Sequence, residues 1–241
     1  MMPYLTTHFG NPSSIYSYGR ETRLAVENAR KTVAKILGAN PGEIFFTSGG
    51  TESNNTAISA AIHDLGCRHI ISSPIEHHAV LHTVEHYGSG DVTLSFVKLL
   101  ANGHVDLDDL EQQLASHEKR CLVTLMHANN EIGTVQPLEE IGKIAAEADV
   151  YFHTDAVQSA GKVAIDVGAM KIDLLSISGH KMYAPKGVGA LYVRGGTRIQ
   201  QLMYGGHHQR GFRPGTENVA GIVGMGKAAE AVPELEAALA L

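Results

Sequence analysis

The sequence predicts an α/β fold built around a mainly parallel sheet. Short apolar runs typical of strands alternate with stretches of helical periodicity through most of the 241 residues. Many of the 26 glycines cluster where a strand would end, as at 49–50 and 205–206. Polar side chains gather directly after several of the same runs. Because ligands of open α/β sheets bind outside the carboxyl ends of the strands, these observations also predict where a site would lie.

The helices are predicted from apolar residues that recur at helical spacing. In residues 19–37, Ala25, Ala29 and Val33 share one face, and Gly38 ends the pattern. One further helix is predicted after residue 55 and another after residue 80. Three more are predicted over 107–114, 138–148 and 219–239, and residues 1–15 are predicted to be a loop.

The strands are predicted from short runs rich in β-branched and aromatic residues. The run 122–126 carries no charged side chain, which is typical of a strand that is buried on both faces. The predicted strands cover 43–47, 69–73, 92–97, 122–126, 150–158, 174–178 and 189–194.

Composition excludes several classes of function. The formal net charge of −6 and the lack of a basic stretch argue against a nucleic-acid partner. No apolar run approaches the roughly 20 residues that cross a bilayer, and no signal-peptide pattern opens the chain. The two cysteines, Cys67 and Cys121, lie far apart and indicate a reducing compartment. We therefore expect a cytoplasmic protein with no membrane partner.

The stretch 48–55 reads as a strand end, a glycine turn and the start of a helix. Free backbone N–H groups and the positive end of the helix dipole make such a turn a phosphate cradle. Gly50 would let the backbone approach the anion, and Thr51 would add a hydroxyl. A helix that is simply capped by Thr51 or Ser48 is the alternative.

Histidines recur after the strand predicted at 69–73. His78, His82 and His86 are spaced four residues apart, as on one face of a helix. No carboxylate or cysteine completes a ligand set, so a surface stripe is favoured over a metal site and no metal is predicted. His77 lies at the strand-to-helix turn, where it would face a ligand at the carboxyl edge of the sheet.

A lysine follows the strand predicted at 174–178. Most lysines between two strands are solvated, yet Lys181, on a turn at a strand end, can be desolvated and become a nucleophile. A phosphate cradle, a lysine and Asp155 on one sheet edge are what pyridoxal phosphate requires: the lysine forms a Schiff base and the aspartate keeps the ring nitrogen protonated. The candidate residues at this edge are Gly50, Thr51, His77, Asn130, Asp155, Gln158, Ser178, His180 and Lys181.

Motifs along nearly the whole chain resemble the cysteine desulfurases, members of the class V aminotransferase group among the fold-type I pyridoxal-phosphate enzymes. The matching stretches are HFGNPSS (8–14), FTSGGTESNN (46–55), EHHAV (76–80), HANNEIGTVQP (127–137), HTDAVQSAGK (153–162), SGHKMYAPKGVGALYVR (178–194) and GGHHQRGFRPGTENVAGIVG (205–224). The NNEIG and RPGTEN stretches are similar to the housekeeping and nitrogen-fixation branch. The resemblance implies a three-layer αβα large domain with a mainly parallel sheet.

The resemblance also implies roles for matched residues. Lys181 would carry the cofactor and move protons, and His77 would stack on its ring and assist proton transfer. Asp155 would pair with the ring nitrogen and Gln158 with the phenolic oxygen, while Asn130 would lie near ring and substrate.

The phosphate would be held by four residues and by a contribution from a second subunit. The four are Gly50, Thr51, Ser178 and His180. Thr216 would reach the phosphate of the partner subunit, which implies a homodimer. In this family L-cysteine is converted to L-alanine, and a cysteine on a mobile loop takes the sulfur for iron–sulfur cluster assembly or thiolation.

The chain departs from the family pattern at both ends, because family members are considerably longer. We expect residues 1–15 to be the remnant of an N-terminal loop, 16–224 the pyridoxal-phosphate-binding large domain, and 225–241 the start of a helix leading to an absent small domain. The family's nucleophilic cysteine and its carboxylate-binding arginine have no counterpart here.

Cys67 and Cys121 are expected to be small buried residues, so this form would be partial or inactive. Two alternatives stay open at this point. One is another class V aminotransferase or lyase that needs no protein thiol. The other is a non-catalytic scaffold that keeps only its dimer and partner contacts.

Overall fold

The computed structural model describes residues 1–116 and 120–232. The strands are β1 (Ile44–Thr47), β2 (His69–Ser72), β3 (Thr93–Phe96), β4 (Cys121–Thr124), β5 (Tyr151–Asp155), β6 (Leu174–Ser178) and β7 (Gly189–Val193). The helices are α1 (Met2–Thr6), α2 (Ser17–Ile36), α3 (Gly50–His63), α4 (His78–Gly88), α5 (Leu107–Ala115), α6 (Leu138–Glu147) and α7 (Val219–Glu230), with short 3₁₀ turns η1 (Pro41–Glu43), η2 (Gly179–Met182) and η3 (His208–Gly211).

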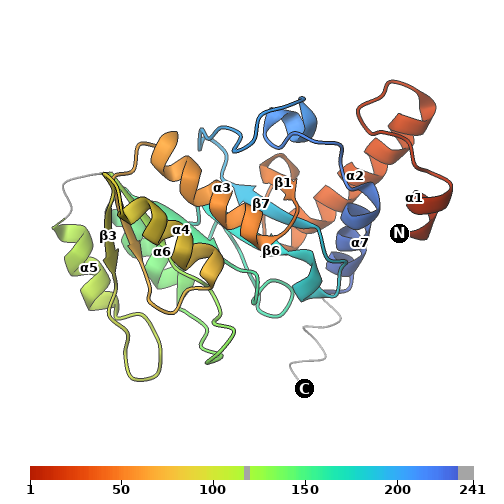
Figure 1. Ribbon diagram of the computed structural model, residues 1–241. Helices are drawn as coiled ribbons and strands as arrows, with labels where there is room; N and C mark the ends of the chain where they lie inside the picture. Colours follow the sequence, from red (N-terminus) through yellow and green to blue (C-terminus); the bar gives the residue numbers. More distant parts are fainter. Residues whose placement is uncertain (117–119, 233–241) are drawn as a thin grey trace, which may run out of the picture.

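The strands form a single sheet in the described part of the chain, in the order β1-β7-β6-β5-β4-β2-β3 (Figure 1). Strands β6, β5, β4, β2 and β3 are parallel to their neighbours in that run. Strand β7 is antiparallel to both β6 and β1. The predicted α/β class with a mainly parallel sheet is thus confirmed.

Helices cover both faces of the sheet, and the side chains of β4 show how the layers are divided. Leu122 packs in a cluster with Ile58 of α3 and Val80 of α4. The next residue, Val123, packs on the opposite face with residues of α2, α5, α6 and α7. Because successive side chains of a strand point to opposite faces, one strand separates two cores. The structure is therefore the three-layer αβα arrangement that was expected (Figure 1).

Strand β5 is shorter than predicted. It ends at Asp155, whereas the sequence predicted a strand over 150–158. The cause is local: the Asp155 side chain accepts a hydrogen bond from the backbone N–H of Val157 at 2.9 Å, and this bond closes a turn. The turn directs the carboxylate toward the carboxyl edge of the sheet.

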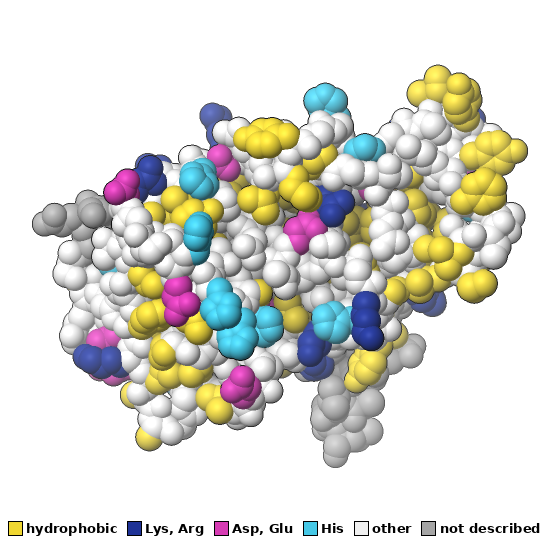
Figure 2. Space-filling view, in the orientation of Figure 1, with side chains coloured by type: hydrophobic (Ala, Val, Ile, Leu, Met, Phe, Trp, Pro, Cys, Tyr) yellow, Lys and Arg dark blue, Asp and Glu magenta, His cyan; other side chains and the backbone are white. Residues whose placement is uncertain are grey.

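The ends of the chain differ in part from the sequence interpretation. Residues 2–6 form α1 where a loop was expected; Pro3 lies in its first turn, where its fixed φ favours a helix start. Figure 2 shows exposed hydrophobic side chains near this end of the molecule. The helix predicted over 219–239 begins at Val219 as expected and is described to Glu230; residues 233–239 lie outside the described residues. No described helix is both long and apolar enough to span a membrane.

Candidate active site

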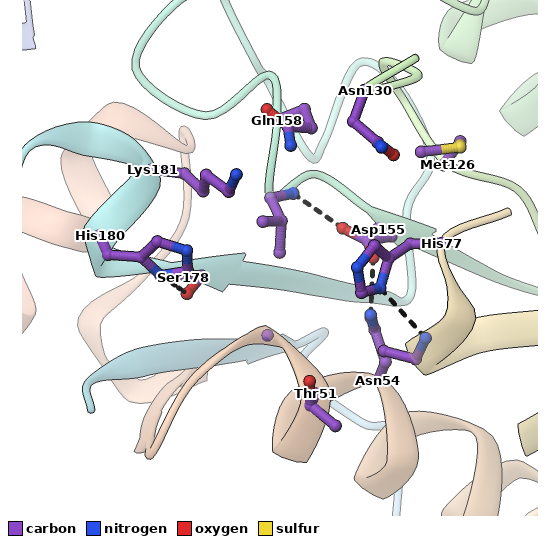
Figure 3. Close-up of a pocket in the computed structure, with 13 residues that line it drawn as sticks. Thr51, Asn54, His77, Met126, Asn130, Asp155, Gln158, Ser178, His180 and Lys181 are labelled. Atoms are coloured by element: carbon purple, nitrogen blue, oxygen red, sulfur yellow. Dashed lines mark hydrogen bonds between the residues drawn. The ribbon is translucent and has the colours of Figure 1, made fainter. Parts of the chain in front are cut away.

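A cavity of about 480 Å³ opens at the carboxyl ends of the parallel strands (Figure 3). It brings together every candidate residue predicted from the sequence except Thr216. The lining residues are Gly50, Thr51, Asn54, His77, Ala79, Met126, Asn130, Asp155, Val157, Gln158, Ser178, His180 and Lys181. They come from five separate segments at strand ends and helix starts, which the sheet gathers at one edge.

One end of the cavity is formed by the N-terminus of α3. No side chain caps this helix: its N-cap residue is Gly49, so capping by Thr51 or Ser48 does not occur. The first N–H groups of a helix lack partners within the helix and are available to an anion. A Cβ at Gly50 would lie 2.6 Å from a side-chain carbon of Val157, so a larger residue would force Val157 to shift where α3 meets the turn after β5. This end can therefore accept a phosphate close to the backbone.

Two side chains from the end of β6 complete the same region. Ser178 Oγ and His180 Nδ1 are hydrogen-bonded at 2.9 Å. Burial and the neighbouring charges of Lys181 and Lys186 lower the pKa of His180, which favours a neutral imidazole at this position. Ser178 and His180 can thus offer hydrogen bonds to an anion, while Lys181, which also lines the cavity, supplies positive charge.

Lys181 lies on η2, directly after β6. Figure 3 shows its side chain reaching from this turn toward the centre of the group. Lys162 lies near it: burial and the positive charge of Lys181 both lower the pKa of Lys162. Lys162 Nζ donates to the backbone carbonyl of Gln158 at 3.0 Å, which fixes the backbone that carries the Gln158 side chain.

Asp155 forms the floor of the cavity. Its Oδ1 accepts from the N–H of Val157 at 2.9 Å, and its Oδ2 accepts from Asn54 Nδ2 at 2.6 Å. Burial raises the pKa of this carboxyl, and the two hydrogen bonds offset part of the rise. A cationic ring nitrogen placed against Asp155 would favour the carboxylate form further.

His77 stands at the rim as the N-cap residue of α4. Its Nδ1 accepts from the backbone N–H of Ala79 at 3.1 Å, so the neutral ring carries its proton on Nε2. The rings of His78 and His82 stack on the exposed surface with centroids 4.8 Å apart. Together with exposed His86 they form the surface stripe that was expected. The described residues contain no group of three or more metal-ligating side chains.

Thr216 lies outside this cavity, in a separate hollow of about 60 Å³. The same segment is tied to α3, because Arg213 Nε donates to Glu52 Oε1 at 2.8 Å. The loop that carries Thr216 is thus anchored next to the N-terminus of α3 at one end of the cavity, although Thr216 itself does not line it. The described chain is one subunit, and the predicted contact of Thr216 with a partner's phosphate stays a prediction.

Sequence reasoning missed three residues that build the site. Asn54 is 1% exposed and holds Asp155, and its Oδ1 has no partner among the described residues. Its position four residues after Gly50, on the same helix face, was the available signal. Met126 lines the wall, and Glu76 lies buried behind it, with its Oε1 accepting from the N–H of Met126 at 2.9 Å.

The residues present fit pyridoxal phosphate. The cavity provides an uncapped helix N-terminus with a glycine at its first position, a buried carboxylate held by two donors, and a lysine that lines the same cavity. These are the three contacts that the phosphate, the ring nitrogen and the carbonyl carbon of this cofactor need.

Neither cysteine contributes to the site. Cys67 and Cys121 are fully buried and do not line the cavity, as the sequence predicted. Burial raises the pKa of each thiol to about 12, so at neutral pH neither forms the thiolate that reacts as a nucleophile.

Comparisons with known proteins agree with the fold and the motifs. The cysteine desulfurase IscS of Dictyoglomus turgidum is 52% identical over 232 residues, which cover 95% of this chain and 58% of the relative. The cysteine desulfurase IscS of Methanosarcina thermophila is 52% identical over 240 residues, covering 98% of this chain and 59% of the relative. The chain therefore spans less than three fifths of the length of these relatives.

Solved structures show the same architecture. A NifS-like protein superposes with a TM-score of 0.93 at 39% identity, covering 98% of this chain and 66% of the other. SspA in complex with cysteine superposes with a TM-score of 0.90 at 43% identity, covering 95% and 66%. The sequence also matches the family described as aminotransferase class-V over residues 1–240. Because this match extends over nearly the whole chain, the protein belongs to the class V aminotransferase family.

Proposed function

We propose that residues 16–224 are the pyridoxal-phosphate-binding large domain of a cysteine desulfurase. The observation that carries the proposal is the convergence of Lys181, Asp155 and the N-terminus of α3 on one cavity. Similarity to cysteine desulfurases supports the choice of L-cysteine as substrate, and one similar solved structure is described as holding cysteine. The part of α7 from residue 225 to Glu230 would then lead out of this domain.

The cofactor would be held by residues that already face one another. Gly50, Thr51, Ser178 and His180 would hold its phosphate, Asp155 its ring nitrogen, Gln158 its phenolic oxygen and Lys181 its carbonyl carbon. When bound, pyridoxal phosphate supplies an electron sink that stabilises the negative charge left when the substrate loses its α-proton.

The chain's own side chains would then handle protons and orientation. The Nζ of Lys181 would take the α-proton of the substrate and return a proton to carbon. His77, whose neutral ring carries its proton on Nε2, offers a second group for proton transfer at the rim. Asn130 also lines the cavity, where it would bind a polar group of the substrate.

The sulfur would leave to a thiol that is not Cys67 or Cys121. In the balanced reaction, L-cysteine and an acceptor thiol give L-alanine and the persulfide of the acceptor. The carbon–sulfur bond breaks, a sulfur–sulfur bond forms, and carbon gains the hydrogen. Because both thiols of this chain are buried, we propose that these 241 residues need an acceptor thiol from another molecule or segment. The sulfur that this thiol accepts would be used for iron–sulfur cluster assembly or thiolation. We further propose a homodimer in which Thr216 reaches the partner's phosphate.

The cofactor proposal is tested by adding pyridoxal phosphate to the 241-residue chain and recording its absorption spectrum. We expect a visible band in the wild-type chain and its loss in Lys181→Ala. Lys186→Ala is the matched control, because Lys186 follows on the same segment, is exposed and does not line the cavity. A colourless wild-type chain, or an unchanged band in Lys181→Ala, would overturn the proposal.

The reaction is tested with the loaded chain, L-cysteine and dithiothreitol as the external acceptor thiol. We expect alanine and sulfide in equal amounts, and no sulfide when dithiothreitol is omitted. Pyruvate with sulfide would instead indicate a lyase, and amino-group transfer to a keto acid would indicate an aminotransferase. No change in melting temperature on addition of pyridoxal phosphate would favour a scaffold that binds no cofactor.

A further inference from the structure

The rim of the cavity is carried by two loops that are tied to each other. One loop follows β2 and includes Glu76 and His77, and the other follows β4 and includes Asn129 and Asn130. In each loop a buried residue is followed by one that lines the cavity: Glu76 is 5% exposed and Asn129 is 7% exposed.

Glu76 makes the first connection between the loops. Its Oε1 accepts from Ser73 Oγ at 2.8 Å, within its own loop. The same oxygen accepts from the backbone N–H of Met126 at 2.9 Å, in the other loop. This side chain therefore connects the loop after β2 to the loop after β4, directly before His77.

Asn129 makes the second connection, in the opposite direction. Its Nδ2 donates to the backbone carbonyl of Ile75 at 2.7 Å. Its Oδ1 accepts from the N–H groups of Glu131 at 2.8 Å and Ile132 at 3.0 Å, which fixes the turn around Asn130. The backbones on both sides of the rim are thereby held by side chains that do not line the cavity themselves.

The state of the Glu76 carboxyl fits this role. Its Oε2 is buried and has no partner among the described residues. An ionised carboxylate would place buried negative charge on an oxygen without a hydrogen-bond donor and would add a second negative charge near Asp155. Burial raises the pKa of Glu76 to about 8, so the group is largely neutral at pH 7. Asp155 is then the carboxylate left to pair with a ring nitrogen.

We propose that Glu76 and Asn129 are positioning residues that hold His77 and Asn130 at fixed places across the cavity. The proposal rests on the proposed function, because it concerns the same site. Neither side chain touches the cofactor in this scheme. Each acts through the loop that it connects.

The test compares Glu76→Ala, Glu76→Gln and Asn129→Ala in the 241-residue chain. Glutamine keeps the oxygen that accepts from Ser73 and Met126, and it is neutral, so it should preserve the connection. Asp173→Ala is the control for losing a buried carboxyl. Asp173 accepts from the N–H of Phe152 at 2.8 Å near the start of β5, at the end of the sheet away from the cavity.

The first measurement is the dissociation constant for pyridoxal phosphate. We expect it to rise at least about tenfold in Glu76→Ala and Asn129→Ala, because a displaced rim residue weakens every contact that depends on its position. It should change by less than about threefold in Glu76→Gln and Asp173→Ala. An equal rise in Glu76→Ala and Asp173→Ala, at equal loss of melting temperature, would overturn the proposal.

The second measurement needs no cofactor and separates this proposal from the proposed function. The ¹H–¹⁵N spectrum of the His77 ring in the apo chain reports its hydrogen bond with Ala79. We expect the ring signals to move in Glu76→Ala and to keep their wild-type positions in Glu76→Gln and Asp173→Ala. Unchanged signals in Glu76→Ala would refute the positioning role, even if the chain binds pyridoxal phosphate. Failure of the wild-type chain to bind it would refute the proposed function alone.

Discussion

Replacing His153 should change how the stability of the protein depends on pH. His153 lies fully buried in β5, between Thr124 of β4 and Ser176 of β6. Its Nδ1 is 2.8 Å from Thr124 Oγ1, and its Nε2 is 3.1 Å from Ser176 Oγ. Burial lowers the pKa of His153 to about 3, whereas the unfolded chain keeps the ordinary value of 6.5. As the pH falls below 6.5, the unfolded state therefore takes up the proton first.

The sign and size of the effect follow from these two pKa values. The stability that the neutral ring provides is complete above pH 6.5 and is lost progressively toward pH 3. Each pH unit in this window corresponds to about 1.4 kcal/mol, so a fall from pH 6.5 to pH 5 removes about 2 kcal/mol. That is a large fraction of the roughly 5–15 kcal/mol that separates folded from unfolded domains.

The variant His153→Asn removes this titration. At pH 7 it should be destabilised by about 2 kcal/mol, because a buried hydrogen bond and part of the packing are lost. At pH 5 the wild-type protein has lost about 2 kcal/mol that the variant does not lose, so the difference between the two should nearly close. Contributions from all other buried titratable groups are common to both proteins and cancel in the comparison.

Urea unfolding followed by circular dichroism at pH 7 and pH 5 measures the difference. His86→Asn is the matched control, because His86 is exposed on α4 and its replacement should leave the pH dependence unchanged. A difference between wild type and His153→Asn that stays constant from pH 7 to pH 5 would refute the reasoning. It would mean that His153 is protonated as readily in the folded protein as in the unfolded one.

Three further predictions concern the site, the sheet edge and the thiols. Asn54→Ala removes one of the two hydrogen-bond donors to Asp155 and should weaken pyridoxal phosphate binding by about tenfold or more. Absorbance titration measures the affinity, and an unchanged value would show that Asn54 does not contribute to cofactor binding. Gln209→Ala removes the side-chain oxygen that accepts a hydrogen bond at 2.9 Å from the backbone N–H of Phe46, in the edge strand β1. The free energy of unfolding should fall by about 2 kcal/mol in urea unfolding, and an unchanged midpoint would contradict this. Cys67 and Cys121 should react with Ellman's reagent at pH 8 only after unfolding, because burial raises both pKa values to about 12; rapid reaction of the native protein would show that one of them is accessible.

Most of the residues that the sequence identified lie at the end of a strand or in the loop that follows it. Asp155 and Lys181 could be placed at one sheet edge because parallel strands bring their carboxyl ends together whatever their order. The strand order itself could not be predicted. Strand β1 pairs with β7, which lies far along the chain, and nothing in either run specifies its partner.

The residues that the sequence did not identify act through hydrogen bonds to groups remote in the chain. Asn54 lies inside a helix, where an asparagine is ordinarily a solvated side chain, and its partner Asp155 lies 101 residues away. No role was predicted for Glu76, because a glutamate in a loop is ordinarily exposed. Only the packing of the loop after β4 against it shows that it is buried. Burial of polar groups is a tertiary property that local patterns do not encode.

The reversed direction of β7 explains how Lys181 is held in place. A parallel partner for β6 would need a long crossover, but an antiparallel one allows a short return, in which the N–H of Gly179 donates to the carbonyl of Val188 at 2.9 Å. The lysine is thus fixed on a turn that is closed at its base by two paired strands. At that base, a Cβ on Gly189 would lie 2.7 Å from Cα of Gly49, the N-cap residue of α3. The turn that carries Lys181 and the N-terminus of α3 are therefore in backbone contact, so neither can shift without the other.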